Sequence, residues 1–151
     1  MNTIFRLSLD GKTLEYVFDY ILGNHRIPDG VEIIPDRIFE GRKLLKNIVI
    51  PHGVTTIGTR AFCGCSSLET ITLPDTIKNI GKEAFAGCDS LHTINLPNTI
   101  DTIEESTFEH CVSLKKLHIP NSVKTIGCRA FCQSGLEDVD IPDSVEIIDE
   151  E

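Results

Sequence analysis

Phenylalanine returns at an interval of 23 residues along this chain, at Phe39, Phe62, Phe85, Phe108 and Phe131. Proline keeps the same interval at Pro28, Pro51, Pro74, Pro97 and Pro120, and Pro142 follows after 22 residues. A fixed period of this length marks a chain that stacks one short structural unit several times, with each unit contacting only its neighbours. The repeat therefore predicts a stacked array of short units.

Each repeat unit changes its pattern twice. The segment 71–73 alternates apolar and polar residues, which is typical of a half-buried strand, and Pro74 ends it because proline cannot donate to a strand ladder. The segment 54–58 predicts a second short extended piece that ends at a glycine. In the segment 61–65, apolar residues stand three apart, which favours one helical or 3₁₀ turn.

No single unit can bury its leucine, isoleucines, phenylalanine and cysteine alone, whereas stacked units bury them in a continuous core. We therefore expect a solenoid of short parallel strands. At a strand spacing of ~4.8 Å, five full units form a body roughly 25 Å long.

The repeat resembles the BspA-type leucine-rich repeats. The pattern L-x-x-I-x-L-P-x-x-V-x-x-I-G-x-x-A-F-x-x-C is nearly intact over 68–88 and 91–111, and the resemblance covers about residues 28–148. It implies a single curved, right-handed leucine-rich-repeat solenoid with mostly short parallel strands and short helical or 3₁₀ turns. It also implies a role in surface adhesion or protein binding. The chain departs from the pattern where Arg42 and Ser134 replace the cysteine and Glu104 replaces the turn glycine.

Three segments follow from this pattern: a hairpin cap with a degenerate repeat over 1–27, five repeats of 22–23 residues over 28–141, and an incomplete acidic repeat over 142–151. In the first, the alternating segments 5–9 and 14–18 flank Asp10-Gly11, a strong hairpin-turn signal. His25 stands where a stacked unit has an apolar residue, which fits a cap. The predicted hairpin is not preceded by the basic and apolar regions of a signal peptide, so we expect none in this sequence.

Acidic residues gather at the C-terminal end. The formal net charge is −9, and the chain from Leu136 onward carries eight acids and no base: Glu137, Asp138, Asp140, Asp143, Glu146, Asp149, Glu150 and Glu151. We expect these charges to protect an exposed strand edge, and an end-to-end dimer through the open repeat stays an alternative. A patch for a basic partner or for Ca²⁺ is the functional alternative, although a full calcium-binding loop is missing.

The six cysteines are expected to be free thiols, and three of them to fill space in the core. Cys65, Cys88 and Cys111 share one column of the repeat, where small buried thiols fill the core. Cys63 and Cys132 share another column three units apart, roughly 14 Å at the strand spacing and too far for a disulfide, whereas Cys128 could approach Cys132. Their spacings match no standard zinc framework, so we expect free thiols and no bound metal or cofactor.

The sequence does not predict an enzyme. Ser66, Ser67 and Ser113 occupy ordinary polar positions, and His92, His110 and His118 fall in different columns. No nucleophile elbow, metalloprotease motif or phosphate-binding glycine loop is present. The net acidity argues against nucleic-acid binding, and no apolar run is long enough to span a membrane.

The outward side of the predicted strands is the expected binding surface. Its two rows are Asn47, Thr70, Thr93, Lys116 and Asp138, and Val49, Thr72, Asn95, His118 and Asp140. Ordinary strand propensity explains the threonines equally well. Pairing of Lys116 with Asp138 would explain part of the charge pattern, and His118 beside Asp140 would form a pH-sensitive pair.

The leading hypothesis is a non-catalytic module that binds another protein through this strand face. The resemblance implies a cell-surface or secreted adhesin whose partner is an extracellular-matrix or host surface protein. The alternatives are an intracellular scaffold, consistent with Met1 and free thiols in the cytoplasm, and a structural spacer within a longer repeat array.

Overall fold

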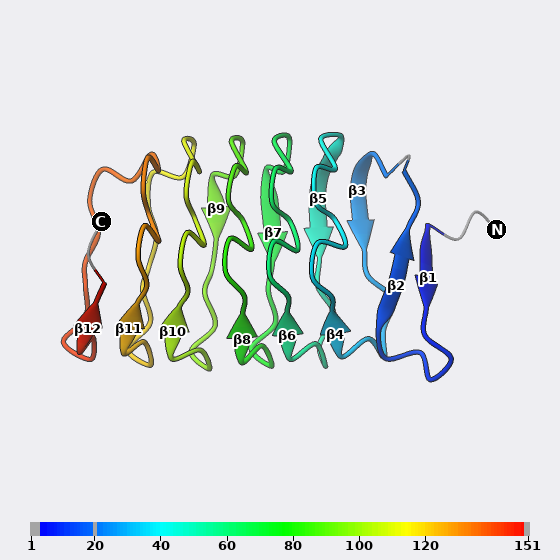
Figure 1. Ribbon diagram of the computed structural model, residues 1–151, viewed down its shortest axis with the longest axis horizontal. Coiled ribbons are helices and arrows are strands. Elements are labelled where there is room, and N and C mark those ends of the chain that lie inside the picture. The colour runs from blue at the N-terminus through cyan, green and yellow to red at the C-terminus, as the bar shows by residue number, and fades with distance from the viewer. Residues whose placement is uncertain (1–3, 20, 150–151) are drawn as a thin grey trace.

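The computed structural model describes residues 4–19 and 21–149. Short strands follow one another along a spiral path, and the N- and C-terminal ends lie at opposite ends of the long axis (Figure 1). The strands are β1 (Phe5–Leu7), β2 (Leu14–Val17), β3 (Gly23–Arg26), β4 (Ile33–Ile34), β5 (Leu45–Val49), β6 (Thr56–Ile57), β7 (Thr70–Thr72), β8 (Asn79–Ile80), β9 (Thr93–Ile94), β10 (Thr102–Ile103), β11 (Thr125–Ile126) and β12 (Ile147–Ile148). The fold is a β-solenoid with parallel strands, as the repeat predicts.

The first side of the solenoid is a parallel sheet in the order β3-β5-β7-β9. Its residues pair across one repeat, as Asn47 pairs with Thr70 and Thr70 with Thr93. In β5, β7 and β9 an isoleucine between outward residues is buried, namely Ile48, Ile71 and Ile94. Alternation within the repeat thus produces one apolar and one outward face, as expected for half-buried strands.

The second side consists of two separate parallel sheets, β4-β6-β8 and β10-β11-β12. These strands come from the second short extended piece of each repeat, which glycine follows at β6, β8 and β11. In every one of these strands except β12, the second residue is an isoleucine that enters the core, as Ile57 and Ile80 do, while Thr56 and Asn79 lie outward. The interruption between β8 and β10 falls in the middle of the array.

The third side is a series of turns. The segment predicted as a helical or 3₁₀ turn has no assigned helix anywhere in residues 4–19 and 21–149. Within one coil, the N–H of Cys63 donates to the carbonyl of Arg60 and that of Cys65 to the carbonyl of Phe62, both at 3.1 Å. The intervening N–H groups donate to the next coil instead, as Phe62 does to Ala84 at 2.9 Å.

The backbone is left-handed at two positions of each turn, four residues apart, as at Arg60 and Gly64, and this prevents a helix from forming. Non-glycine residues accept it in one column of the repeat, including Arg60 with φ 56°. The conformational cost of this left-handed backbone is offset because the turn side gains a ladder of hydrogen bonds between coils. This conformation is hard to predict from the sequence, since no glycine marks the column of Arg60.

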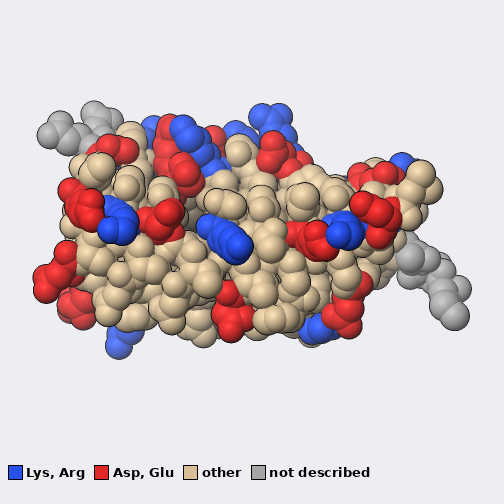
Figure 2. Space-filling view, turned by 90° about the horizontal axis from the view of Figure 1, so that it is seen from below, with Lys and Arg blue, Asp and Glu red and all other residues tan. Residues whose placement is uncertain are grey.

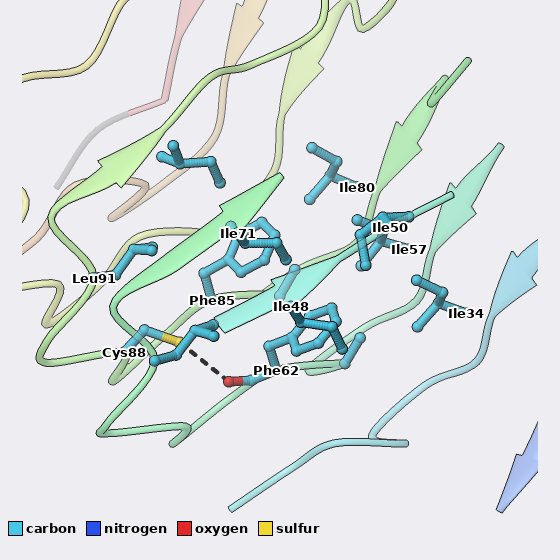
Figure 3. Close-up of a cluster of buried hydrophobic side chains, with 14 of the residues drawn as sticks. Ile34, Ile48, Ile50, Ile57, Phe62, Ile71, Ile80, Phe85, Cys88 and Leu91 are labelled. Atoms are coloured by element: carbon cyan, nitrogen blue, oxygen red, sulfur yellow. Dashed lines mark hydrogen bonds between the residues drawn. The ribbon is translucent and has the colours of Figure 1, made fainter. Parts of the chain in front are cut away.

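The core is a stack of identical residues (Figure 3). The rings of Phe39, Phe62, Phe85, Phe108 and Phe131 stack face to face, with centroid separations of 4.7, 5.7, 5.6 and 6.0 Å and interplanar angles of 7–15°. The first four are fully buried. The 23-residue interval therefore places each ring directly on its predecessor.

The cysteine column lies beside the rings. Cys65, Cys88 and Cys111 are fully buried, and the Sγ of Cys88 donates to the carbonyl oxygen of Phe62 at 3.2 Å (Figure 3). The same contact joins Cys65 to Phe39 and Cys111 to Phe85. All six cysteines are free, so the prediction of buried thiols in this column is confirmed.

A hairpin covers the N-terminal end. Strands β1 and β2 pair antiparallel around the turn at Asp10 and Gly11, with Phe5 opposite Val17. Phe5 packs edge to face against Phe39, the first ring of the stack, and against His25. The ring of His25 also forms a 2.9 Å hydrogen bond with the carbonyl of Leu22, which explains how a polar residue lies beneath the hairpin.

At the C-terminal end, β12 leaves Ile147 and Ile148 more than half exposed. Six of the eight acids in this region lie in the described residues, whereas Glu150 and Glu151 lie outside them. Lys124 binds Glu146 at 2.9 Å and Lys115 lies 3.6 Å from Glu137, so bases of the preceding coil partly neutralise these acids.

Candidate binding surfaces

The outward face of the β3-β5-β7-β9 sheet, here called the strand face, holds the first six of the ten predicted binding residues. Asn47 and Val49 lie on β5, Thr70 and Thr72 on β7, and Thr93 on β9, while Asn95 follows directly after β9. Val49 pairs with Thr72, so the two predicted rows run side by side across the coils.

Hydrogen bonds join the first row into a polar ladder. The Nδ2 of Asn47 donates to the Oδ1 of Asn24 at 2.6 Å, and the Oγ1 of Thr70 donates to the Oδ1 of Asn47 at 2.5 Å. These bonds fix the orientation of the side chains before any partner arrives. Asn24, on β3, belongs to the row although the sequence prediction began it at Asn47.

The other four predicted residues are exposed but lie outside the sheet. The sheet ends at β9, and no strand is assigned in residues 115–121 or 136–142. The physical reason is visible in the outward rows, where β-branched threonines give way to Lys116, His118, Asp138 and Asp140. These residues have lower strand propensity, and the two aspartates repel each other.

Their predicted pairings do not form either. Among the described residues, Lys116 lies within 4.0 Å of no carboxylate, and the ion pair across these coils joins Lys115 to Glu137 in the adjacent column. His118 forms no ion pair with Asp140 within that distance in the described part of the chain. The structure therefore contradicts the Lys116–Asp138 pairing and gives no contact for a pH-sensitive pair.

A second surface feature arises where β8 and β10 fail to pair. At the preceding junction, the N–H groups of Lys78 and Asn79 donate to the carbonyl of Thr55, and that of Gly81 to the carbonyl of Ile57. The equivalent residues one repeat later are Asp101, Thr102 and Glu104. Within the described coils, their N–H groups make no bonds to Lys78 or Ile80.

Glu104 stands at the interruption, where it replaces the glycine of the repeat. A Cβ added at Gly81 would lie 2.5 Å from the backbone nitrogen of Thr59, and one at Gly127 would lie 2.6 Å from that of Glu105. Such contacts are far shorter than van der Waals separation, so a side chain in this column requires the backbone to shift. At the last coil, Asp149 accommodates this shift and still donates its N–H to the carbonyl of Ile126 at 2.9 Å, whereas at Glu104 the pairing is lost. The departure is visible in the sequence, but its consequence is not.

A groove of about 260 Å³ runs along the glycine column, from Asp36 across β6 and β8 to the open junction. We call it the glycine-column groove. Gly58 and Gly81 contribute only backbone to it, and the charged residues that line it are Asp36, Lys78, Asp101 and Glu104. Sequence reasoning noted the exception at Glu104 but assigned no site there.

Charges alternate along the edge that borders this groove (Figure 2). The row follows the residues Lys12, Glu32, Thr55, Lys78, Asp101, Lys124 and Glu146 in successive coils. Lys12 binds Glu32 at 2.8 Å and Lys124 binds Glu146 at 2.9 Å. Lys78 and Asp101, which face each other across the open junction, form no ion pair within 4.0 Å.

The buried thiols are chemically inert. Burial raises the pKa of Cys65 and of Cys111 to about 12 and that of Cys88 well above its usual value. With these raised pKa values, the three thiols remain protonated at neutral pH. The thiolate is the form that acts as a nucleophile or binds a metal, so these thiols do neither at neutral pH. Burial also raises the pKa of Cys63, although Arg60 opposes the effect.

Metal binding and membrane insertion each require a particular arrangement of residues. Residues 4–19 and 21–149 contain no group of three or more His, Cys, Asp or Glu side chains arranged to hold a metal ion. No helix in these same ranges has the length and apolarity needed to cross a bilayer. What the structure offers is two surfaces, the strand face and the glycine-column groove.

A parallel solenoid of this repeat length, with a flat polar sheet on one side, defines a leucine-rich-repeat protein. The chain belongs to the family of BspA-type leucine-rich repeat proteins, whose model matches six copies of the repeat over residues 16–151. This confirms the family predicted from the repeat pattern. None of the curated protein sequences matches the chain.

Solved structures agree with this assignment. The chain is similar to a leucine-rich repeat protein of T. pallidum, with 33% identity and a TM-score of 0.82 over 94% of this chain and 71% of that one. It is also similar to a leucine-rich cell surface protein of Faecalibacterium prausnitzii, with 28% identity and a TM-score of 0.70 over 95% of this chain and 48% of that one. The pneumococcal vaccine antigen PcpA shares the fold at 20% identity, with a TM-score of 0.59 over 96% of this chain and 46% of that chain.

Proposed function

We propose that this chain is a non-catalytic module that binds another protein through the strand face. The observation that carries the proposal is the ladder from Asn24 through Asn47 to Thr70, whose side chains are held in place by hydrogen bonds. A surface whose polar groups are already ordered loses less side-chain entropy on binding than a mobile one.

The exposed residues beside this ladder supply the variable contacts. Thr72, Thr93 and Asn95 project from the sheet, and Lys116 and His118 continue the same columns beyond its end. Such a surface suits a protein partner with a broad, polar contact area, since it has no deep apolar pocket for a small ligand.

We propose a cell-surface adhesin as the biological setting, with an extracellular-matrix or host surface protein as the partner. Support comes from the likeness to a leucine-rich cell surface protein of Faecalibacterium prausnitzii. That protein is more than twice as long as the matched region, so its setting is transferred here only as a proposal.

The test is binding of the chain to immobilised fibronectin and fibrinogen at low and at physiological salt. Asn95→Arg places a bulky cation in the strand face, whereas Asn98→Arg places the same side chain on the exposed turn after Pro97. We expect saturable binding that the first variant weakens at least about tenfold and the second leaves unchanged, since tenfold corresponds to ~1.4 kcal/mol.

Equal effects of the two variants would refute the strand face as the site. Absence of binding by a folded chain to either protein would refute these partners and favour the scaffold or spacer alternatives.

A further inference from the structure

The glycine-column groove lies on the second side of the solenoid, away from the strand face. It includes the place where β8 and β10 are unpaired and where Glu104 replaces the glycine of the repeat. The N–H groups of Asp101, Thr102 and Glu104 and the carbonyls of Lys78 and Ile80 have no backbone partner in this part of the described chain. Backbone groups in a folded protein are normally paired with protein, water or a ligand, so this junction is a place where another molecule can make hydrogen bonds.

The carboxylates around the groove keep acceptor positions that no described side chain fills. Glu104 is half-buried, and its carboxylate takes part in no hydrogen bond or ion pair with the described side chains. Asp101 accepts only from the hydroxyl of its neighbour Thr102, at 3.0 Å. Asp36 accepts from the backbone N–H of Thr59 at 2.7 Å and keeps its other carboxylate oxygen available.

The charge balance selects a cationic occupant. Three carboxylates and one ammonium, that of Lys78, line the groove, and the two free carbonyls add neutral acceptors. An arginine side chain carries five N–H donors in a planar fork that matches carboxylates and carbonyls, and its stem can lie along the glycine backbone. A volume of about 260 Å³ far exceeds the ~30 Å³ that one liquid water occupies.

We propose that the glycine-column groove binds an arginine side chain of a partner protein, with Asp101 and Glu104 contacting the guanidinium. The groove is a site separate from the strand face and does not depend on the function proposed above. In a complex it would anchor one residue of the partner, while the remaining contacts lie elsewhere.

The experiment titrates the full ¹⁵N-labelled chain with N-acetyl-arginine amide and follows the backbone amide resonances. We expect saturable shifts at Asp101, Thr102 and Glu104, with a dissociation constant on the order of millimolar, as befits a single side chain. N-acetyl-citrulline amide has nearly the same shape but no charge, and we expect no saturable shift with it.

Two variants test the named contacts. Glu104→Gln keeps the side-chain volume, and with it the open junction, but removes the charge, so the affinity should fall roughly two- to fivefold, as for a partly exposed ion pair. Asp101→Asn should act in the same direction. Glu137→Gln removes an acid at the C-terminal end and is the matched control, for which we expect no change.

The proposal is overturned if arginine amide causes no saturable shift, if citrulline amide binds equally, or if both groove variants leave the affinity unchanged. Asn95→Arg, the strand-face variant, should not alter these shifts. Failure here therefore leaves the adhesin proposal standing, and failure of matrix binding leaves this one standing.

Discussion

Replacing Glu104 by glycine should close the open junction and stabilise the solenoid. Glycine removes the Cβ at the open junction. Glycine occupies this column at three of the four paired junctions on this side, and Asp149 occupies it at the fourth, between β11 and β12. The N–H groups of Asp101, Thr102 and residue 104 can then donate to the carbonyls of Lys78 and Ile80, as their counterparts do one repeat earlier.

The magnitude follows from the number of bonds. Three backbone hydrogen bonds at a net ~1 kcal/mol each contribute about 3 kcal/mol. The greater freedom of glycine in the unfolded chain subtracts roughly 0.5–1 kcal/mol. The expected gain is therefore about 2 kcal/mol in the free energy of unfolding, or roughly 4–8 °C in Tm for a chain of this size.

Urea denaturation and amide hydrogen exchange measure this prediction together. Stability should rise, and the amides of Asp101 and Thr102 should become protected in Glu104→Gly. The reciprocal variant Gly81→Glu should open a second junction, deprotect Lys78 and Asn79, and lower stability by about 3 kcal/mol. If Glu104→Gly leaves stability within ~0.5 kcal/mol and the amides still exchange rapidly, the steric account of the open junction is wrong.

Three further predictions concern the core and the turns. Phe62→Ala, in the middle of the ring stack, should cost about 3–5 kcal/mol of unfolding free energy in urea denaturation, whereas Phe18→Ala on the half-exposed Phe18 should cost under ~1 kcal/mol. His110 has φ 59° in a column that Gly41, Gly64 and Gly87 occupy in the preceding repeats. His110→Gly should therefore raise the thermal midpoint and Gly87→Ala should lower it, each by an amount equivalent to ~1 kcal/mol. Shifts of the opposite sign would contradict the strain argument. Because the folded pKa of Cys65 and Cys111 is raised to about 12, the unfolded chain loses these protons first, so stability should be unaffected by these thiols below pH ~8 and fall between pH ~9 and 12. Alanine at both positions should flatten that alkaline decline in pH-dependent urea titrations, and an unchanged slope would show that other groups cause it.

The sequence predicted those parts of the fold that depend on one residue type recurring at one interval. The phenylalanine and cysteine columns could be placed in the core because stacking translates a period directly into contact. The strand ladder could be extended over Thr70 and Thr93 for the same reason, but not over Lys116 and Asp138, where strand propensity fell below what a short ladder needs.

The open junction and the turn side escaped prediction for a different reason. Both depend on backbone geometry, which the residue pattern does not express. Glu104 stands out as an exception to glycine, yet so does Asp149, whose coil stays paired. The 2.5 Å contact at the equivalent Gly81 shows that a side chain there requires a backbone shift, and the residue pattern does not express which coil can make that shift. Arg60 adopts a left-handed conformation that glycine usually marks in a sequence. A glycine is not needed here, because the hydrogen bond from the N–H of Arg60 to the carbonyl of Lys82 in the next coil compensates for the strain.

The hydrogen bonds between coils run in opposite directions on two sides of the molecule. On the turn side, Phe62 of one coil donates forward to Ala84 of the next, whereas on the second side Thr55 donates backward to Glu32. Peptide dipoles add when they are aligned head to tail, as in an α-helix, and cancel when they oppose. A solenoid built this way carries a smaller net peptide dipole along its long axis than one in which every hydrogen bond between coils pointed the same way.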